Sequence, residues 1–129
     1  MKQSDETDIV CIDRVLKYVQ TLNDIYNTFN INTLNDLESN HICQLAVTQT
    51  VTNIHQLRQK IRTETLDKMP LFGNLKPMLK AARNIASHDY YSLDFEIIYR
   101  LTRHLLKPEM RSELEATKNG IKCSQANDI

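Results

Sequence analysis

The segment DIVCIDRVLKYVQTLNDIYNT, residues 8–28, carries an apolar side chain at almost every third or fourth position. This spacing defines one face of an amphipathic α-helix, whereas a strand would alternate every two residues. Asp8 stands at the start of the pattern, and aspartate is a residue type that commonly caps helices. We therefore predict a first helix from about Asp8 to Thr28, with Asp8 available to cap it.

The same periodicity returns along the rest of the chain. It predicts a short helix at Thr33–Glu38, a long helix from Asn40 to Ile61, a third containing Leu75–Ala86, a fourth from Ser92 or Asp94 that ends or kinks at Pro108, and a short terminal helix at Glu109–Lys118. Pro77 is tolerated in the first turn of the third helix. Pro70 and Gly73 are expected to bracket a loop with an apolar tip, Leu71-Phe72.

Few helix-breaking residues interrupt these segments, since the 129 residues include only two glycines and three prolines. Long helices joined by short connections place neighbours antiparallel. The expected fold is therefore all-α, an up-and-down bundle of four main helices plus a short C-terminal helix. By length this is one domain, which we place at residues 1–119, with a flexible tail at 120–129.

Charge and cysteine content bound the function only loosely. Sixteen basic and sixteen acidic residues give a net charge of zero, although basic residues predominate after position 50. Three cysteines without CxxC spacing indicate reduced thiols and no zinc site. The polar, acidic first residues are not typical of a signal peptide, and no apolar run approaches about 20 residues. We expect a cytoplasmic protein without a membrane segment.

The stretch Arg83-Asn84-Ile85-Ala86-Ser87-His88-Asp89-Tyr90 concentrates chemically competent side chains. Arginine is always charged and histidine titrates near neutral pH, a pair suited to cleaving a phosphodiester without metal. On a continuous helix, Arg83 and His88 lie about 140° apart and do not share a face, whereas Asn84 and His88 do. The site requires a helix end near His88 or counterparts from a second copy.

This segment resembles the motif of the HEPN superfamily of helical ribonucleases, in which arginine and a polar residue precede histidine. Arg-x4-His-x-Tyr is similar to the HepT-like branch, toxins paired with minimal nucleotidyltransferase antitoxins. The following segment, Tyr91–Tyr99, and Pro108 fit that branch as well. The resemblance covers roughly residues 8–115 and is strongest over 80–106.

The resemblance implies a symmetric homodimer whose two motifs face each other across a cleft and cut RNA without metal or cofactor. His88 would act as general base or acid, Arg83 would stabilise charge on the phosphate, and Asn84 would orient or bind it. Tyr90 matches the tyrosine that the partner nucleotidyltransferase modifies with AMP, and Tyr91 beside it is a competing acceptor. The added anion would block the cleft and repel RNA.

A local basic patch is expected to help bind RNA. Its candidates are Arg100, Arg103, His104, Lys107 and Arg111. A solvated face of the fourth helix is an equally good interpretation of these residues. His41, Cys43 and His55 fit no standard metal spacing, and we predict no metal site. Two other functions stay open: a non-catalytic helical partner of a nucleotidyltransferase, and a plain interaction bundle in which the motif is coincidental.

Overall fold

The computed structural model describes residues 2–88 and 95–127, with side chains over 5–84 and 95–125. Within these residues every regular element is a helix and no strand occurs, which confirms the predicted all-α class. The elements are α1 (Lys2–Thr28), α2 (Leu34–Glu38), α3 (His41–Lys60), α4 (Thr63–Leu66), α5 (Pro70–Gly73), α6 (Lys76–His88), α7 (Phe95–Leu105) and α8 (Pro108–Asn127).

Capping side chains lie at several of the helix boundaries that the sequence predicts. The Asn40 side chain accepts a hydrogen bond from the backbone N–H of Cys43 at 2.9 Å and starts α3. Thr33 and Asp36 form a reciprocal capping box at the start of α2. Pro108 begins α8, so the fourth predicted helix ends before it, at Leu105. The expected start of that helix, at Ser92 or Asp94, lies outside the described residues.

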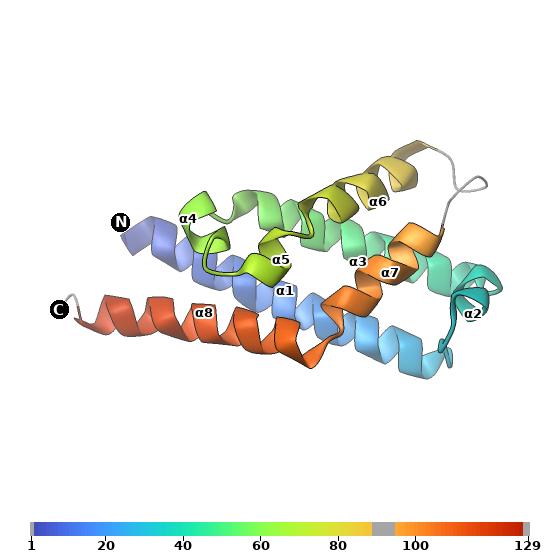
Figure 1. Cartoon of the computed structure of the whole chain (residues 1–129), viewed down its shortest axis with the longest axis horizontal. Coiled ribbons are helices and arrows are strands. Elements are labelled where there is room, and N and C mark those ends of the chain that lie inside the picture. The colour runs from blue at the N-terminus through green and yellow to red at the C-terminus, as the bar shows by residue number, and fades with distance from the viewer. Residues whose placement is uncertain (1, 89–94, 128–129) are drawn as a thin grey trace.

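The long helices α1, α3 and α8 run along the length of the molecule, and α6 lies along α3 (Figure 1). Helix α1 packs against both α3 and α8, while α7 packs against α6 and leads into α8. The first turns of α1 and the last turns of α8 lie at the same end of the molecule (Figure 1). Helix α3 therefore separates α1 from α6, the helix that carries the arginine–histidine motif.

The core forms where the apolar faces of these helices meet. Its completely buried members include Ile12, Val15 and Leu22 of α1, Val47 and Ile54 of α3, Leu79 of α6, Ile98 and Leu101 of α7, and Leu114 of α8. Burying each such side chain stabilises the fold by about 1.5–3 kcal/mol before conformational entropy is counted. The three-to-four-residue spacing read from the sequence thus identifies the core face of each long helix.

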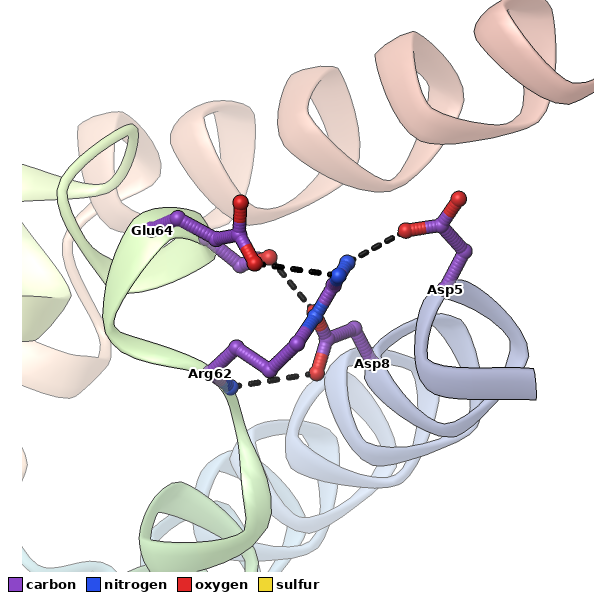
Figure 2. A network of polar contacts seen from close by, with 5 residues as sticks. Asp5, Asp8, Arg62 and Glu64 are labelled. Carbon is purple, nitrogen blue, oxygen red and sulfur yellow. Dashed lines mark hydrogen bonds and ion pairs between the residues drawn. The ribbon is translucent and has the colours of Figure 1, made fainter. Parts of the chain in front are cut away.

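Asp8 does not cap α1, contrary to the prediction. The helix begins at Lys2, and Asp8 lies within it as a fully buried carboxylate. Its oxygens accept hydrogen bonds from Nε of Arg62 at 2.8 Å and from the Thr65 hydroxyl at 2.5 Å. Figure 2 shows that the Arg62 guanidinium contacts the Asp8 carboxylate. The carboxylates of Asp5 and Glu64 also form ion pairs with this guanidinium. The hydrogen bond to Asp8 raises the pKa of Arg62. This network fastens α1 to the connection between α3 and α4.

The predicted loop between Pro70 and Gly73 is also wrong, because these residues form the short helix α5. The Glu113 carboxylate of α8 accepts hydrogen bonds from the backbone N–H groups of Leu71 and Phe72 at 2.9 and 3.0 Å. This carboxylate satisfies the free donors of the first helical turn. Of the two residues of the expected apolar tip, Phe72 is completely buried in the core, whereas Leu71 remains 47% exposed.

The C-terminal helix is longer than predicted. Helix α8 continues past Lys118 and Gly120 to Asn127, where a flexible tail was expected. Ile121 is buried against the core, which gives the extra turns an apolar contact that supports them. Among the described residues, none of the helices is both long and apolar enough to cross a membrane.

Candidate functional site

Helix α6 carries the first part of the arginine–histidine motif. Pro77 lies in its first turn, where a missing N–H costs nothing, and Leu79 and Ala82 bury the face that packs on α3. Arg83 and Asn84 follow on the exposed side of the helix. The periodicity that fixes the buried face therefore also directs these two polar side chains toward solvent.

Arg83 and His88 lie on one unbroken helix, and α6 ends at His88. Five helical residues correspond to a rotation of about 140°, so positions 83 and 88 lie on different sides of the helix. Asn84 lies one turn before His88 and shares its side of the helix. The side chain of His88 lies outside the described part of the structure, as do Tyr90 and Tyr91. Within one chain, position 88 therefore shares the helical side of Asn84 and not that of Arg83.

His55 of α3 is a buried histidine beside this segment, and its side chain is only 3% exposed. Neither ring nitrogen has a hydrogen-bond partner among the described residues. Burial lowers the pKa of His55, and the positive charges of Arg83, Arg58 and Lys80 lower it further. The imidazole is thus held neutral at the seam between α3 and α6, where the fields of three cations converge.

Sequence reasoning considered His55 only together with His41 and Cys43, as a set that fits no standard metal spacing, and missed this environment. The described residues contain no group of three or more histidine, cysteine or acidic side chains that could hold a metal ion. His55 follows Val47 and Val51 at four-residue intervals, so it continues a buried apolar stripe. That register is the signal that could have identified His55 as a buried residue.

A second feature missed by sequence reasoning is a row of cations on α6. Lys76, Lys80 and Arg83 follow one another at four- and three-residue spacing, and all three are exposed. The helix sequence KPMLKAARNIASH contains no acidic residue. Within the described part of the chain, Lys76 and Lys80 form no ion pair with a carboxylate. We call Lys76, Lys80 and Arg83 the α6 ridge.

The candidates for the predicted basic patch do not all lie on one helix. Arg100 and Arg103 are exposed on α7, and the Arg103 guanidinium carbon lies 6.0 Å from the centre of the Tyr99 ring. Arg111, however, belongs to α8 and pairs with Glu115 at 3.2 Å. Because α7 ends at Leu105, the five predicted cations do not share one helical side. The expectation that these five cations lie on one helical side is therefore wrong, and the role of Arg100 and Arg103 in RNA binding stays a prediction.

Comparison with known proteins adds no relative to this description. No family model, no curated protein and no solved structure matches the chain.

Proposed function

We propose that this chain is an endoribonuclease toxin of a toxin–antitoxin pair that cleaves RNA by a metal-independent route. The observation that carries the proposal is the Arg83-x4-His88-x-Tyr90 segment, similar to the HepT-like motif, with Arg83 and Asn84 exposed on α6 and His88 at the helix end. The negative end of the helix dipole favours a protonated histidine at that position. Such a group can donate a proton beside a phosphate.

In the proposed reaction, the ribose 2′-oxygen loses its proton and attacks the adjacent phosphorus. The bond from phosphorus to the 5′-oxygen then breaks, which leaves a 2′,3′-cyclic phosphate and a 5′-hydroxyl. His88 would move a proton as base or acid, and Arg83 would stabilise the negative charge that develops on the phosphate. Asn84 would hold the phosphate, and Arg100 and Arg103 of α7 would contribute to RNA binding.

The proposed active unit is a homodimer. Since Arg83 and His88 occupy positions about 140° apart around α6, a cleft that uses both is best supplied by two copies of the chain. The scaffold would be the up-and-down bundle of four main helices expected for this motif. We place the protein in the cytoplasm, where RNA is available.

Control by a partner nucleotidyltransferase follows from the same resemblance. Attachment of AMP to Tyr90 would place a negative charge two residues from His88 and repel RNA phosphates. The test is the intact mass of the chain produced together with such an enzyme, compared between Tyr90→Phe and Tyr91→Phe. An AMP adduct lost only in Tyr90→Phe supports the assignment, and loss only in Tyr91→Phe contradicts it.

Cleavage itself is tested with the purified unmodified protein and transfer or messenger RNA in the presence of a chelator. We expect products with 2′,3′-cyclic phosphate ends, and we expect Arg83→Ala and His88→Ala to abolish them. His41→Ala, at an exposed position of α3, is the matched control. No cleavage by the wild type, or equal cleavage by His88→Ala, would contradict the proposal. A stable complex with a nucleotidyltransferase without cleavage would instead favour a non-catalytic partner.

A further inference from the structure

The α6 ridge has the geometry of a surface that follows a charged polymer. A helix rises 1.5 Å per residue, so Lys80 lies about 6 Å and Arg83 about 10 Å along the axis from Lys76. Exposed residues at these spacings share one side of the helix. The ridge therefore presents a line of positive charge that leads directly to the position of the proposed catalytic segment.

A surface cavity of about 350 Å³ continues this line at the start of α6. Arg58, Asn74 and Lys76 supply donors to its wall, and among the described residues Asp67 is the one carboxylate that lines it. Arg58 extends from α3 and donates a hydrogen bond to the backbone oxygen of Gly73 at 3.0 Å. The basic surface thus spans two helices, from this cavity to Arg83.

His55 lies buried at the seam between α3 and α6, within the field of these cations. Burial lowers its pKa, and the charges of Arg83, Arg58 and Lys80, which belong to both sides of the seam, lower it further. Its two ring nitrogens and Nε of Arg58 are buried donors or acceptors without partners in the described part of the structure. Positive charge from both helices is therefore concentrated around this seam.

We propose that the α6 ridge and Arg58 bind the phosphates of single-stranded RNA and lead the strand to the dimer cleft. This inference rests on the proposed ribonuclease function and specifies the path of its substrate. The absence of acidic side chains from α6 favours a polyanion, and a basic groove that follows the backbone is the usual way to hold a single strand. It also explains how a chain with zero net charge can bind RNA: the positive charge is local.

The test measures binding instead of cleavage, in the His88→Ala background, with a labelled single-stranded RNA of about 16 nucleotides. Lys76→Gln with Lys80→Gln removes two phosphate contacts from exposed positions. We expect weaker binding, and a slope of log affinity against log salt that is shallower by about 1.4. Arg14→Gln with Lys122→Gln removes the same charge from exposed sites of α1 and α8 and is expected to change neither quantity.

A second readout is the pKa of His55, followed by the NMR signals of its ring. Bound phosphates would offset the field of the three cations, so RNA is expected to raise this pKa in the His88→Ala protein and to raise it less in the ridge variant. An unchanged salt slope in the ridge variant, an equal change in the control, or tighter binding of polyglutamate than of RNA would overturn the inference. Ridge-dependent binding without cleavage by the wild type would contradict only the catalytic proposal.

Discussion

Asp8 of α1 and Arg62 are fifty-four residues apart in the sequence, and the Oδ2 and Nε atoms of their side chains lie 2.8 Å apart. Asp8 is fully buried, whereas Arg62 is partly exposed and also contacts Asp5 and Glu64. The pair joins the first helix to the segment that follows α3. It therefore fixes one end of the helix on which α6 packs.

Asp8→Ala is expected to destabilise the protein mainly through Thr65. The Thr65 hydroxyl is buried and donates to Asp8, so the substitution leaves it without an acceptor and costs about 1–3 kcal/mol. Urea denaturation measures the change. Asp24→Ala on the same helix, where the exposed carboxylate accepts a hydrogen bond from Gln20 at 3.0 Å, is expected to cost less than about 0.5 kcal/mol. Equal losses in the two variants would contradict a specific role for Asp8.

Tyr26→Phe tests the link between α1 and α7. The Thr102 hydroxyl donates to the backbone oxygen of Tyr99, so it accepts from Tyr26, whose oxygen lies 2.5 Å away. Loss of this buried hydrogen bond is expected to cost about 1 kcal/mol, with Tyr18→Phe on the same helix as the control. Burial raises the pKa of Tyr26 to about 12. Because the folded state favours the neutral phenol, stability should fall between the ordinary pKa of 10.0 and this value, and Tyr26→Phe should remove that loss.

The elements that the sequence predicts well are those determined by local spacing and caps. Helices α1, α3 and α6 follow from apolar periodicity, and Asn40 caps α3 where its side-chain type indicates. The errors concern residues whose partners are distant in the chain. Asp8 has the residue type of a helix cap, but its side chain instead accepts a hydrogen bond from Arg62. Likewise, no local pattern reveals that Glu113 accepts the hydrogen bonds of the first turn of α5.

The candidate site likewise combines local features, which the sequence predicts, with tertiary features, which it does not. Sequence places Arg83, Asn84 and His88 on one helix, which is local information, and the structure agrees. The neutral state of His55 depends on burial between α3 and α6 and on charges from both helices, which are tertiary properties. Arg111 does not share a helical side with Arg100 and Arg103, because α7 ends at Leu105, before that residue.

Stability is expected to decrease as the solution is acidified, through His55. Its pKa lies below the ordinary 6.5 in the folded state, so the unfolded chain binds the proton more readily. The stabilisation that neutral His55 contributes should therefore be fully present above pH 6.5. The free energy of unfolding should fall as the pH decreases from 6.5 toward the lowered pKa. Denaturation of the wild type and His55→Leu between pH 5 and pH 8 tests this prediction. A pH dependence that is as steep in His55→Leu would assign the effect to other groups.

Glu113→Ala is expected to destabilise α5 without unfolding α8. The variant removes the acceptor of two backbone N–H groups in the first turn, at a cost of about 1 kcal/mol, comparable to the loss of a helix cap. Glu113→Gln retains one side-chain oxygen and should lose less. Glu115→Ala, a surface carboxylate of the same helix paired with Arg111, is the control. Hydrogen exchange at Leu71 and Phe72 reports the effect directly, and unchanged exchange in Glu113→Ala would contradict it.

The arrangement of Arg83 and His88 on α6 predicts complementation between two inactive variants. Homodimers of Arg83→Ala lack the group that stabilises the phosphate, and homodimers of His88→Ala lack the group that transfers the proton. A mixed dimer retains one Arg83 and one His88 from different chains. Because the two positions lie about 140° apart around one helix, a cleft assembled across the dimer axis can use that pair, whereas a site within one chain cannot.

The experiment compares two refolded mixtures. The rate of RNA cleavage should rise when the variants Arg83→Ala and His88→Ala are unfolded together and refolded as a mixture. The double variant Arg83→Ala/His88→Ala mixed with His88→Ala should stay inactive. Equal inactivity of both mixtures, with mixed dimers present by mass spectrometry, would show that the cleft is not shared in this way.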